Sequence, residues 1–127
     1  MADILLIDDM AGVQSTVGKM LTRGGHRVTA ADDGGKGIEL LTSRRFDLVV
    51  TDVLMPRVDG IEVLMFANSM PVRPPVIVVS GGGPDVPADR ALMLAKHRAD
   101  AVLAKPFAGG DLLAAVARLL AGAGKAA

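Results

Sequence analysis

Hydrophobic residues in this chain form two alternating patterns. Short apolar runs, such as Ile-Leu-Leu-Ile at residues 4–7, are typical of buried β-strands. Between these runs, apolar residues recur with the spacing of an amphipathic helix, as at Val13, Val17, Met20 and Leu21. The pattern predicts strands at residues 4–7, 27–31, 46–51, 76–79 and 101–104. It predicts helices at residues 11–23, 37–43, 61–68, 87–97 and 110–121.

The repeated order of strand then helix indicates one α/β domain. Several strands are apolar at successive positions, so both of their faces are buried, as in a parallel sheet that helices cover on both sides. The connections are then expected to be right-handed crossovers. We assign residues 1–122 to this domain and expect residues 123–127 to form a small-residue C-terminal tail that frays.

Composition excludes several classes of protein. The 127 residues include no cysteine, which excludes disulfides, thiol nucleophiles and cysteine zinc sites. Basic and acidic residues balance at 14 each, and no basic stripe indicates direct binding to nucleic acid. No apolar run reaches the ~18–20 residues of a membrane-spanning helix, and the acidic Asp3 does not fit a signal peptide. We therefore expect a cytoplasmic protein without membrane insertion.

Polar residues follow the predicted strands at the point where each strand ends. Asp8 and Asp9 follow the first strand, Asp52 the third, Ser80 the fourth and Lys105 the fifth. Ligands of open α/β sheets bind outside the carboxyl ends of the strands. Neighbouring carboxylates repel one another unless a cation intervenes, and oxygen ligands suit Mg²⁺. A carboxylate in such a site can attack phosphorus and form an aspartyl phosphate, while fixed charges stabilise the transferred oxygens.

Each of these residues also has an ordinary structural interpretation. Either Asp8 or Asp9 would serve as a cap for the first helix. Asp52 alone fits a turn before the proline that follows it. Ser80 and Lys105 are each unexceptional at a strand end. What favours a site is their joint position after the first, third, fourth and fifth strands.

Five short motifs together resemble a known family. They are Ile-Asp-Asp at residues 7–9, Asp-Leu-Val-Val-Thr-Asp-Val-Leu-Met-Pro at 47–56, Asp-Gly at 59–60, Ser-Gly at 80–81 and Lys-Pro-Phe at 105–107. Over essentially its whole length the chain resembles the receiver domain of two-component response regulators, including stand-alone CheY-like members. The resemblance implies a flavodoxin-like (βα)5 three-layer sandwich whose parallel strands lie in the order 2-1-3-4-5.

The resemblance also implies a role for each residue at the strand ends. Asp52 is similar to the phosphoryl acceptor, and Ser80 and Lys105 are similar to the hydroxyl and ammonium that contact the phosphoryl group. The implied ligands of Mg²⁺, or alternatively Mn²⁺, are Asp8, Asp9, Asp52 and the Leu54 backbone carbonyl, with Asp8 acting mainly through water. Such a domain catalyses its own phosphorylation and dephosphorylation and is not a turnover enzyme.

Two kinds of partner follow from the same resemblance. The donor would be a phosphohistidine on a sensor histidine kinase or on a histidine phosphotransfer protein. A downstream protein would bind the face formed by the fourth helix, the fifth strand and the fifth helix. In this chain that face offers Arg90, Met93, Lys96, His97 and Arg118, which would otherwise form an ordinary solvated surface.

Three positions depart from the family pattern. Val102 stands where an aromatic partner of the hydroxyl is usual, so we expect the signal to pass through residues 81–87 and the helix after them. Gly82 stands where a side chain usually flanks the path of the hydrolytic water, in a glycine run that either cradles phosphate or loosens the loop. Ala108 stands at the usual capping position of the last helix. Asp111 partly compensates through the helix dipole, and we expect this helix to begin in a mobile turn.

Three other functions fit parts of the sequence. An FMN-binding flavodoxin-like protein shares the fold, but its phosphate loop is rich in Ser, Thr and Gly where this chain has Asp8 and Asp9, and no Trp or Tyr is present to stack on a flavin. A haloacid-dehalogenase-type phosphatase needs a general acid two residues after its nucleophile, where this chain has Leu54. A degenerate receiver that acts only as an interaction module ranks below an active switch, because every residue for phosphorylation is present.

Overall fold

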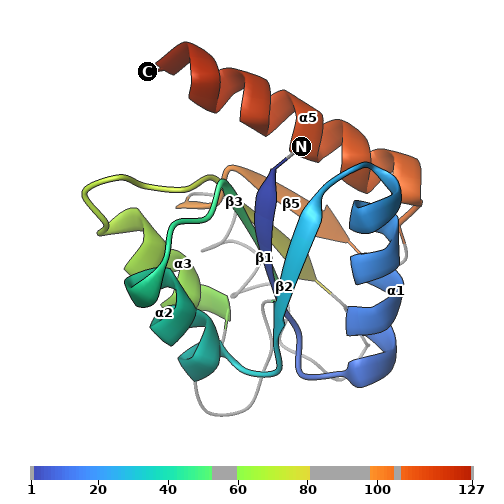
Figure 1. The fold of residues 1–127 in the computed structure, drawn as a ribbon, viewed down its shortest axis with the longest axis horizontal. Helices are drawn as coiled ribbons and strands as arrows, with labels where there is room; N and C mark the ends of the chain where they lie inside the picture. The colour runs from blue at the N-terminus through green and yellow to red at the C-terminus, as the bar shows by residue number, and fades with distance from the viewer. Residues whose placement is uncertain (1, 53–59, 81–97, 105–106, 127) are drawn as a thin grey trace.

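Five parallel strands form a single sheet in the order β2-β1-β3-β4-β5 (Figure 1). The computed structural model describes residues 2–52, 60–80, 98–104 and 107–126. Its strands are β1 (Asp3–Ile7), β2 (Arg27–Ala31), β3 (Leu48–Asp52), β4 (Val76–Ser80) and β5 (Ala101–Ala104). Its helices are α1 (Ala11–Arg23), α2 (Gly34–Ser43), α3 (Gly60–Asn68) and α5 (Gly109–Ala126). The flavodoxin-like fold and the strand order implied by the resemblance are confirmed.

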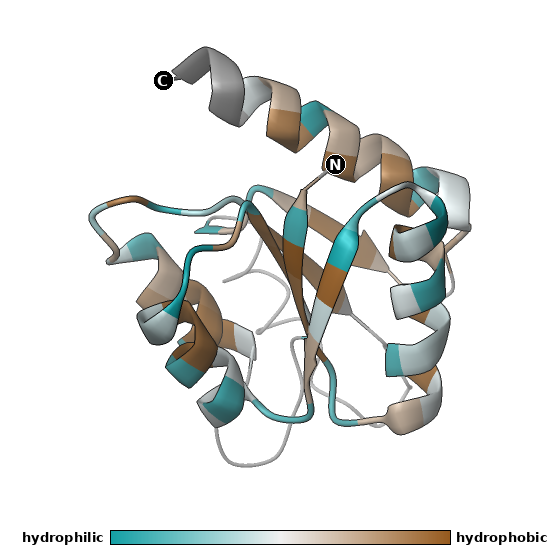
Figure 2. Cartoon of the chain, viewed as in Figure 1, coloured by the Kyte–Doolittle hydropathy of each residue, from teal (hydrophilic) through white to brown (hydrophobic). Residues whose placement is uncertain are grey.

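The sheet separates two hydrophobic clusters, because successive residues of a strand point to opposite faces. In β1, Leu5 and Ile7 belong to one cluster, while Ile4 and Leu6 belong to the other. Helices α2 and α3 cover the first face, and α1 and α5 cover the second (Figure 1). Hydrophobic residues therefore run along the strands and the inner faces of the helices (Figure 2). This arrangement is the three-layer sandwich that the apolar runs predict.

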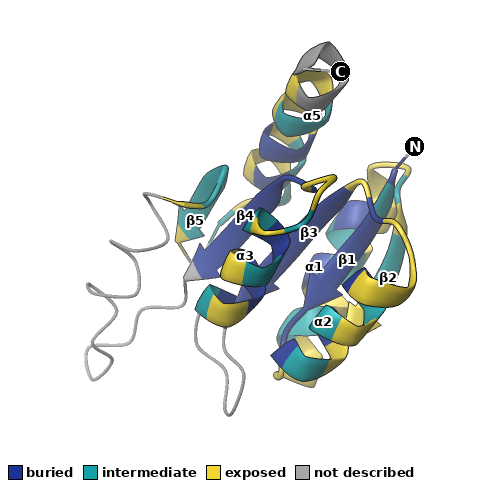
Figure 3. Ribbon diagram, turned by 90° about the vertical axis from the view of Figure 1, so that its left-hand side faces the viewer, coloured by how far each residue is buried: buried dark blue, intermediate teal, exposed yellow. Residues whose placement is uncertain are grey.

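Burial differs between the central and the outer strands. Every residue of β3 is buried, and so are the four residues of β1 after Asp3. The outer strands β2 and β5 are largely half-buried or exposed, as Figure 3 shows by colour. Residues at the carboxyl ends of β1 and β3 consequently follow two central, buried strands.

Helix α1 ends in a Schellman motif at the predicted glycine stop. The N–H of His26 donates to the Leu21 carbonyl at 3.2 Å, and the N–H of Gly25 donates to the Thr22 carbonyl at 3.0 Å. Gly25 has a φ of 89°, a left-handed conformation that favours glycine. The motif turns the chain directly into β2.

The ends of two helices differ from the predictions. Helix α2 begins at Gly34, not at residue 37, because Asp33 caps it by accepting a hydrogen bond from the Lys36 N–H at 2.8 Å. Helix α5 continues to Ala126, so the predicted end at residue 121 is wrong and the expected tail is mostly helical. The domain limit at residue 122 stays a prediction, and the helix predicted at residues 87–97 lies outside the described residues.

Helix α2 packs very close to β1 at Gly37. A Cβ atom built at this position would overlap the Cδ1 atom of Ile7 and would lie 2.9 Å from its Cγ1 atom. Since Ile7 is fully buried, it has little space in which to move. Glycine is therefore required here by packing. Across the described residues, no helix is both long and apolar enough to cross a membrane.

Candidate functional site

Three carboxylates meet at the carboxyl end of the sheet. Asp8 and Asp9 follow β1, and Asp52 is the last residue of β3, which pairs with β1 through Ile7 and Thr51. One carboxylate oxygen from each aspartate lies within 4.8 Å of the other two. We call Asp8, Asp9 and Asp52 the carboxylate cluster. The structure thus brings together the three acidic residues that the strand ends predict.

Asp8 is fixed by hydrogen bonds on both its main chain and its side chain. Its N–H donates to the Ala31 carbonyl at 3.1 Å, and its Oδ1 accepts from the Met10 N–H at 2.9 Å. The Gln14 side chain donates to the carbonyls of Asp8 and Ala31, both at 3.2 Å. The N-cap residue of α1 is Met10, so neither aspartate occupies the capping position that the alternative interpretation gave them. Sequence analysis missed Gln14, which ties the ends of β1 and β2 together.

Asp52 is part of a strand and not of a turn. It pairs with Val79 of β4, and only 7% of its surface is exposed. Thr51 donates its hydroxyl to the Asp52 carbonyl at 3.0 Å in this buried region. The turn interpretation of Asp52 is therefore wrong, and its carboxylate projects from a fixed backbone.

Burial makes the negative charges of the carboxylate cluster energetically costly. Asp8 is 3% exposed and Asp52 is 7% exposed, whereas Asp9 is exposed. Buried charges are costly unless other groups compensate them. The donor set consists of carboxylate oxygens, which is the ligand chemistry of hard divalent cations such as Mg²⁺. The residues present fit such an ion, and Asp8, Asp9 and Asp52 are the side chains that would hold it.

The other predicted site residues are only partly within the described structure. Ser80 is the last residue of β4, and its backbone pairs with Ala104, the last residue of β5. Lys105 follows Ala104 in the sequence but lies outside the described residues, as does Leu54. The glycine run at 81–83 and the predicted output residues Arg90, Met93, Lys96 and His97 also lie outside the described residues.

Two departures from the family pattern fall within the described structure. Val102 pairs with Val78 in the sheet and is half-buried against the hydrophobic cluster beneath α2 and α3. At the start of α5, the Ala108 carbonyl accepts from the Asp111 N–H at 3.0 Å, while the Asp111 carboxylate accepts from the Ala108 N–H at 3.4 Å. Asp111 thus supplies the reverse half of a capping box, where sequence analysis expected only a dipole effect.

Comparison with known proteins identifies the family. Residues 4–117 match the family described as the response regulator receiver domain, so the chain belongs to this family of two-component signalling domains. The response regulator MprA of Mycolicibacterium vanbaalenii is 38% identical over 117 residues, which cover 92% of this chain and 49% of that protein. MprA of Mycobacterium ulcerans is 37% identical, with the same coverage. The chain spans about half the length of these curated relatives.

Solved receiver domains have the same fold. A response regulator receiver domain from Clostridium thermocellum is 28% identical with a TM-score of 0.81, and the match covers 94% of each chain. A CheY-like receiver domain protein from Methanospirillum hungatei reaches a TM-score of 0.87 at 24% identity, over 100% of this chain and 99% of that one. This second similarity concerns the fold alone.

Proposed function

We propose that this chain is a phosphorelay receiver in which Asp52 accepts a phosphoryl group from a phosphohistidine donor. The observation that carries the proposal is the carboxylate cluster, with two of its three members buried at the carboxyl end of a receiver-type sheet. The donor would belong to a sensor histidine kinase or a histidine phosphotransfer protein. The domain would act on itself and not turn over a separate substrate.

In the proposed step, a carboxylate oxygen of Asp52 attacks the phosphorus of the donor. The new O–P bond forms as the P–N bond breaks, and the donor imidazole keeps the electron pair and takes up a proton. Because Asp52 ends a fully buried strand, its carboxylate reaches the phosphorus with little loss of conformational freedom. The Ser80 hydroxyl and the Lys105 ammonium would contact the transferred phosphoryl oxygens.

A divalent ion fits the remaining chemistry of the site. Bound Mg²⁺, or Mn²⁺ in its place, would neutralise negative charge on the phosphoryl oxygens. The proposed ligands are Asp8, Asp9 and Asp52, together with the Leu54 backbone carbonyl. The hydrogen bonds from Met10 and Gln14 would keep Asp8 in position whether or not a phosphoryl group is present.

The proposed output is a change in protein contacts on the face of the fourth helix, β5 and α5. Val102 packs into the sheet, so no aromatic side chain at this position moves when the phosphoryl group arrives. We propose instead that Ser80 acts through residues 81–87 and the helix that the sequence predicts after them. Arg118, exposed on α5, belongs to the surface that the partner would meet.

Phosphotransfer from a radiolabelled histidine kinase tests the proposed chemistry. The wild type and Asp32→Asn should both be labelled, and the label should be removed by hydroxylamine. Asp32 is a matched control because it is an exposed carboxylate at the same end of the sheet, paired with Lys36 at 3.3 Å. Asp52→Asn should remain unlabelled, and chelation of Mg²⁺ should prevent labelling of the wild type. Equal labelling of Asp52→Asn would overturn the assignment of the acceptor.

Beryllofluoride with Mg²⁺ separates an active switch from a degenerate receiver. This phosphoryl mimic should shift the backbone amide resonances near Asp52 in the wild type and should leave Asp52→Asn unchanged. Shifts that extend to residues 98–104 would support transmission toward β5. A wild-type spectrum that the mimic does not alter would favour a domain that serves only for protein interaction.

A further inference from the structure

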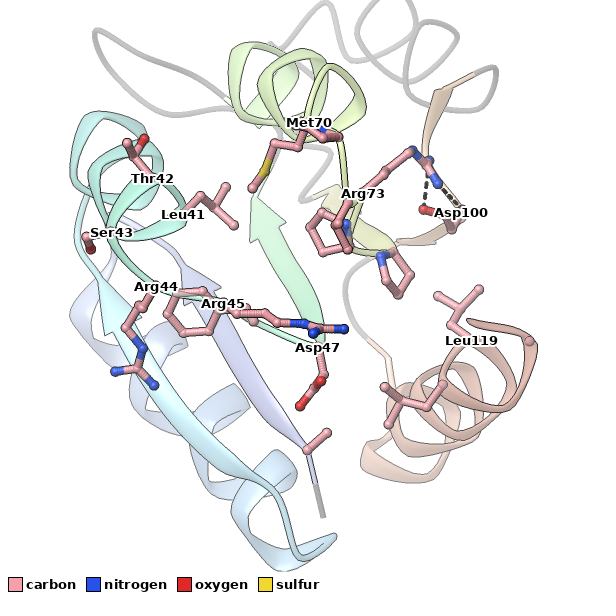
Figure 4. Close-up of a pocket in the computed structure, with 18 of the residues that line it drawn as sticks. Leu41, Thr42, Ser43, Arg44, Arg45, Asp47, Met70, Arg73, Asp100 and Leu119 are labelled. Carbon is pink, nitrogen blue, oxygen red and sulfur yellow. Dashed lines mark hydrogen bonds and ion pairs between the residues drawn. The ribbon is translucent and has the colours of Figure 1, made fainter. Parts of the chain in front are cut away.

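A large cleft lies at the amino end of the sheet, opposite the carboxylate cluster (Figure 4). Residues that immediately precede four of the strands line it: Ala2, Asp47, Pro75 and Asp100. The rest of its wall comes from residues 41–46, 70–74, 118–120 and 122. Its volume is about 1250 Å³. We call it the arginine cleft, because Arg44, Arg45, Arg73 and Arg118 line it.

Apolar side chains from three separate segments surround the arginine cleft. Leu41 comes from α2, Met70 from the segment after α3, and Leu119 from α5 (Figure 4). Met70 and Leu119 are only half-buried. Val72 is 67% exposed, which makes it the most exposed large hydrophobic residue in the described structure. The cleft therefore leaves apolar surface available to a ligand.

The acidic residues of the cleft are already occupied within the domain. The Asp47 carboxylate accepts the Asp3 N–H at 2.8 Å. The Asp100 carboxylate pairs with Arg73 at 3.0 Å and also accepts the Val76 N–H at 2.8 Å. Asp100 is thereby paired with Arg73, whereas Asp47 keeps its negative charge and offsets the charge of one other arginine of the wall.

Three arginines in the wall have no carboxylate partner among the described residues. They are Arg44, Arg45 and Arg118, and all three are exposed. Arg44 lies over the Phe46 ring, with its guanidinium carbon 4.6 Å from the ring centroid. The charge of Asp100 offsets that of Arg73, and the charge of Asp47 offsets that of one further arginine. Among the described residues, the cleft therefore keeps an excess of positive charge at the end of the sheet opposite the carboxylate cluster.

Helix dipoles explain only part of this collection of arginines. Basic residues are favoured near the C-terminal ends of helices, which accounts for Arg44 at the end of α2. Arg45 and Arg73 lie in loops, and Arg118 lies in the middle of α5, so the dipole does not account for them. The remaining common feature of these arginines is the cleft that they line.

We propose that the arginine cleft binds an amphipathic, acidic segment of a partner protein. Small-molecule pockets are typically about 300–1,000 Å³, and this cleft exceeds that range, so a peptide segment fits it better. Amphipathic helices bind grooves through apolar anchors, for which Met70, Val72 and Leu119 are available. Carboxylates on the polar face of the segment would pair with Arg45 and Arg118. Arginine is favoured for such pairs because it binds carboxylates in a bidentate manner.

Binding at this cleft leaves the proposed phosphorylation site accessible, because the two lie at opposite ends of the strands. A partner could therefore hold the domain while a donor approaches Asp52. The inference stands on the cleft alone and does not depend on the phosphorylation chemistry. Its failure and the failure of the proposed function are therefore separate results.

Two synthetic amphipathic peptides with the same leucine pattern provide the test. One carries glutamates on its polar face, and the other carries lysines. The glutamate peptide should bind saturably in fluorescence anisotropy and should shift the amide resonances of residues 44–47, 72–73 and 118–122. Arg45→Glu should lower the affinity for the glutamate peptide by about tenfold or more, and tenfold is equivalent to ~1.4 kcal/mol of binding free energy. Arg45→Glu should still be phosphorylated on Asp52 at the wild-type level.

Matched variants separate a specific cleft from general attraction. Arg23→Glu makes the same charge change at the end of α1, outside the cleft wall, and should alter the affinity by less than about twofold. Val72→Ser, which changes no charge, should lower the affinity for the glutamate peptide. Equal binding of the lysine peptide, or equal loss in Arg45→Glu and Arg23→Glu, would overturn the proposal. Self-association of the free protein through the same resonances would also overturn it, since the occupant would be a second copy.

Discussion

Replacing Asp52 with asparagine removes one negative charge from the carboxylate cluster and keeps the size of the side chain. In the absence of divalent ions, the charges of Asp8 and Asp9 would then lose a repulsive neighbour within 4.8 Å. We therefore expect Asp52→Asn to be more stable than the wild type when divalent ions are chelated. Most substitutions at a buried position destabilise a protein, so a gain in stability is a distinctive expectation.

The size of the gain follows from the separation of the charges. Two unit charges at 4.8 Å repel by roughly 3–4 kcal/mol at an effective dielectric constant of about 20, which suits the buried pair of Asp8 and Asp52. The pair with the exposed Asp9 is closer to the value in water, ~1 kcal/mol. Asp52 has other interactions that asparagine would weaken, and salt screens part of the repulsion. A net gain of about 1–3 kcal/mol in the free energy of unfolding is expected.

Urea denaturation of both proteins, with EDTA or with excess MgCl₂, measures the effect. A ligand at about 100 times its Kd stabilises a folded protein by roughly 2.7 kcal/mol, so Mg²⁺ should stabilise the wild type by about this amount. Asp52→Asn should gain clearly less stability from Mg²⁺, because it lacks one of the proposed charged ligands. Asp32→Asn is the control and should change stability by less than about 0.5 kcal/mol, since its ion pair with Lys36 is exposed.

The reasoning fails if Asp52→Asn is no more stable than the wild type in EDTA at low ionic strength. Groups of the chain itself would then already neutralise the cluster, and repulsion would not favour a bound cation. It also fails in a second way if Mg²⁺ stabilises both proteins equally. In that case the ion would bind without Asp52.

Three further predictions concern helix packing, the start of a helix and a hydrogen bond at the start of a strand, and urea denaturation checks each of them. Gly37→Ala should lower the free energy of unfolding by about 1–3 kcal/mol because its methyl group would overlap Ile7. Gly12 is also helical, but apart from its chain neighbours and the backbone of its own helix no atom lies within 4 Å of a Cβ built there. Gly12→Ala should therefore raise the free energy of unfolding by about 0.5–1 kcal/mol, and shifts of the same sign in both variants would contradict this packing. Asp111→Ala should lower the free energy of unfolding by about 0.5–2 kcal/mol and accelerate amide exchange in the first turn of α5. Unchanged exchange would mean that the Asp111 carboxylate does not stabilise the start of this helix. Asp100→Ala should lower the free energy of unfolding by about 1–3 kcal/mol, because the half-buried backbone N–H of Val76 in β4 loses its acceptor. A decrease of less than about 0.5 kcal/mol would count against that hydrogen bond.

Much of the fold could be predicted because its physical signals are local in the sequence. Runs such as residues 4–7 and 76–79 identify strands that are buried on both faces, and the glycines after residue 23 mark the end of α1. The sequence pattern predicts the start of α2 at residue 37, near the apolar residues Ile38 and Leu41, whereas the helix begins at Gly34 and includes two further glycines. The cap from Asp33 outweighs the poor helix propensity of those glycines. Propensity alone could not have shown this.

The carboxylate cluster could be predicted because parallel strands end at the same side of a sheet. The order of Asp8, Asp9 and Asp52 along the chain therefore implies that they lie near one another. Gln14 could not be assigned a role in the same way, since its two acceptors belong to residues 8 and 31 and are brought together only by the fold. The arginine cleft was missed for a similar reason, because its wall comes from several separate segments.

The position of β1 in the sheet has a consequence for how the chain folds. Ile4 pairs with Val28 on one side and with Leu48 on the other, so β1 lies between two strands that both follow it in the chain. Parallel pairs require long crossovers, and such distant contacts slow folding. The centre of the sheet cannot close until the chain extends to the end of β3, which is Asp52. The pairing of β1 with β3 and the carboxylate cluster therefore both require β3, so a chain that has not yet placed β3 beside β1 lacks a complete cluster.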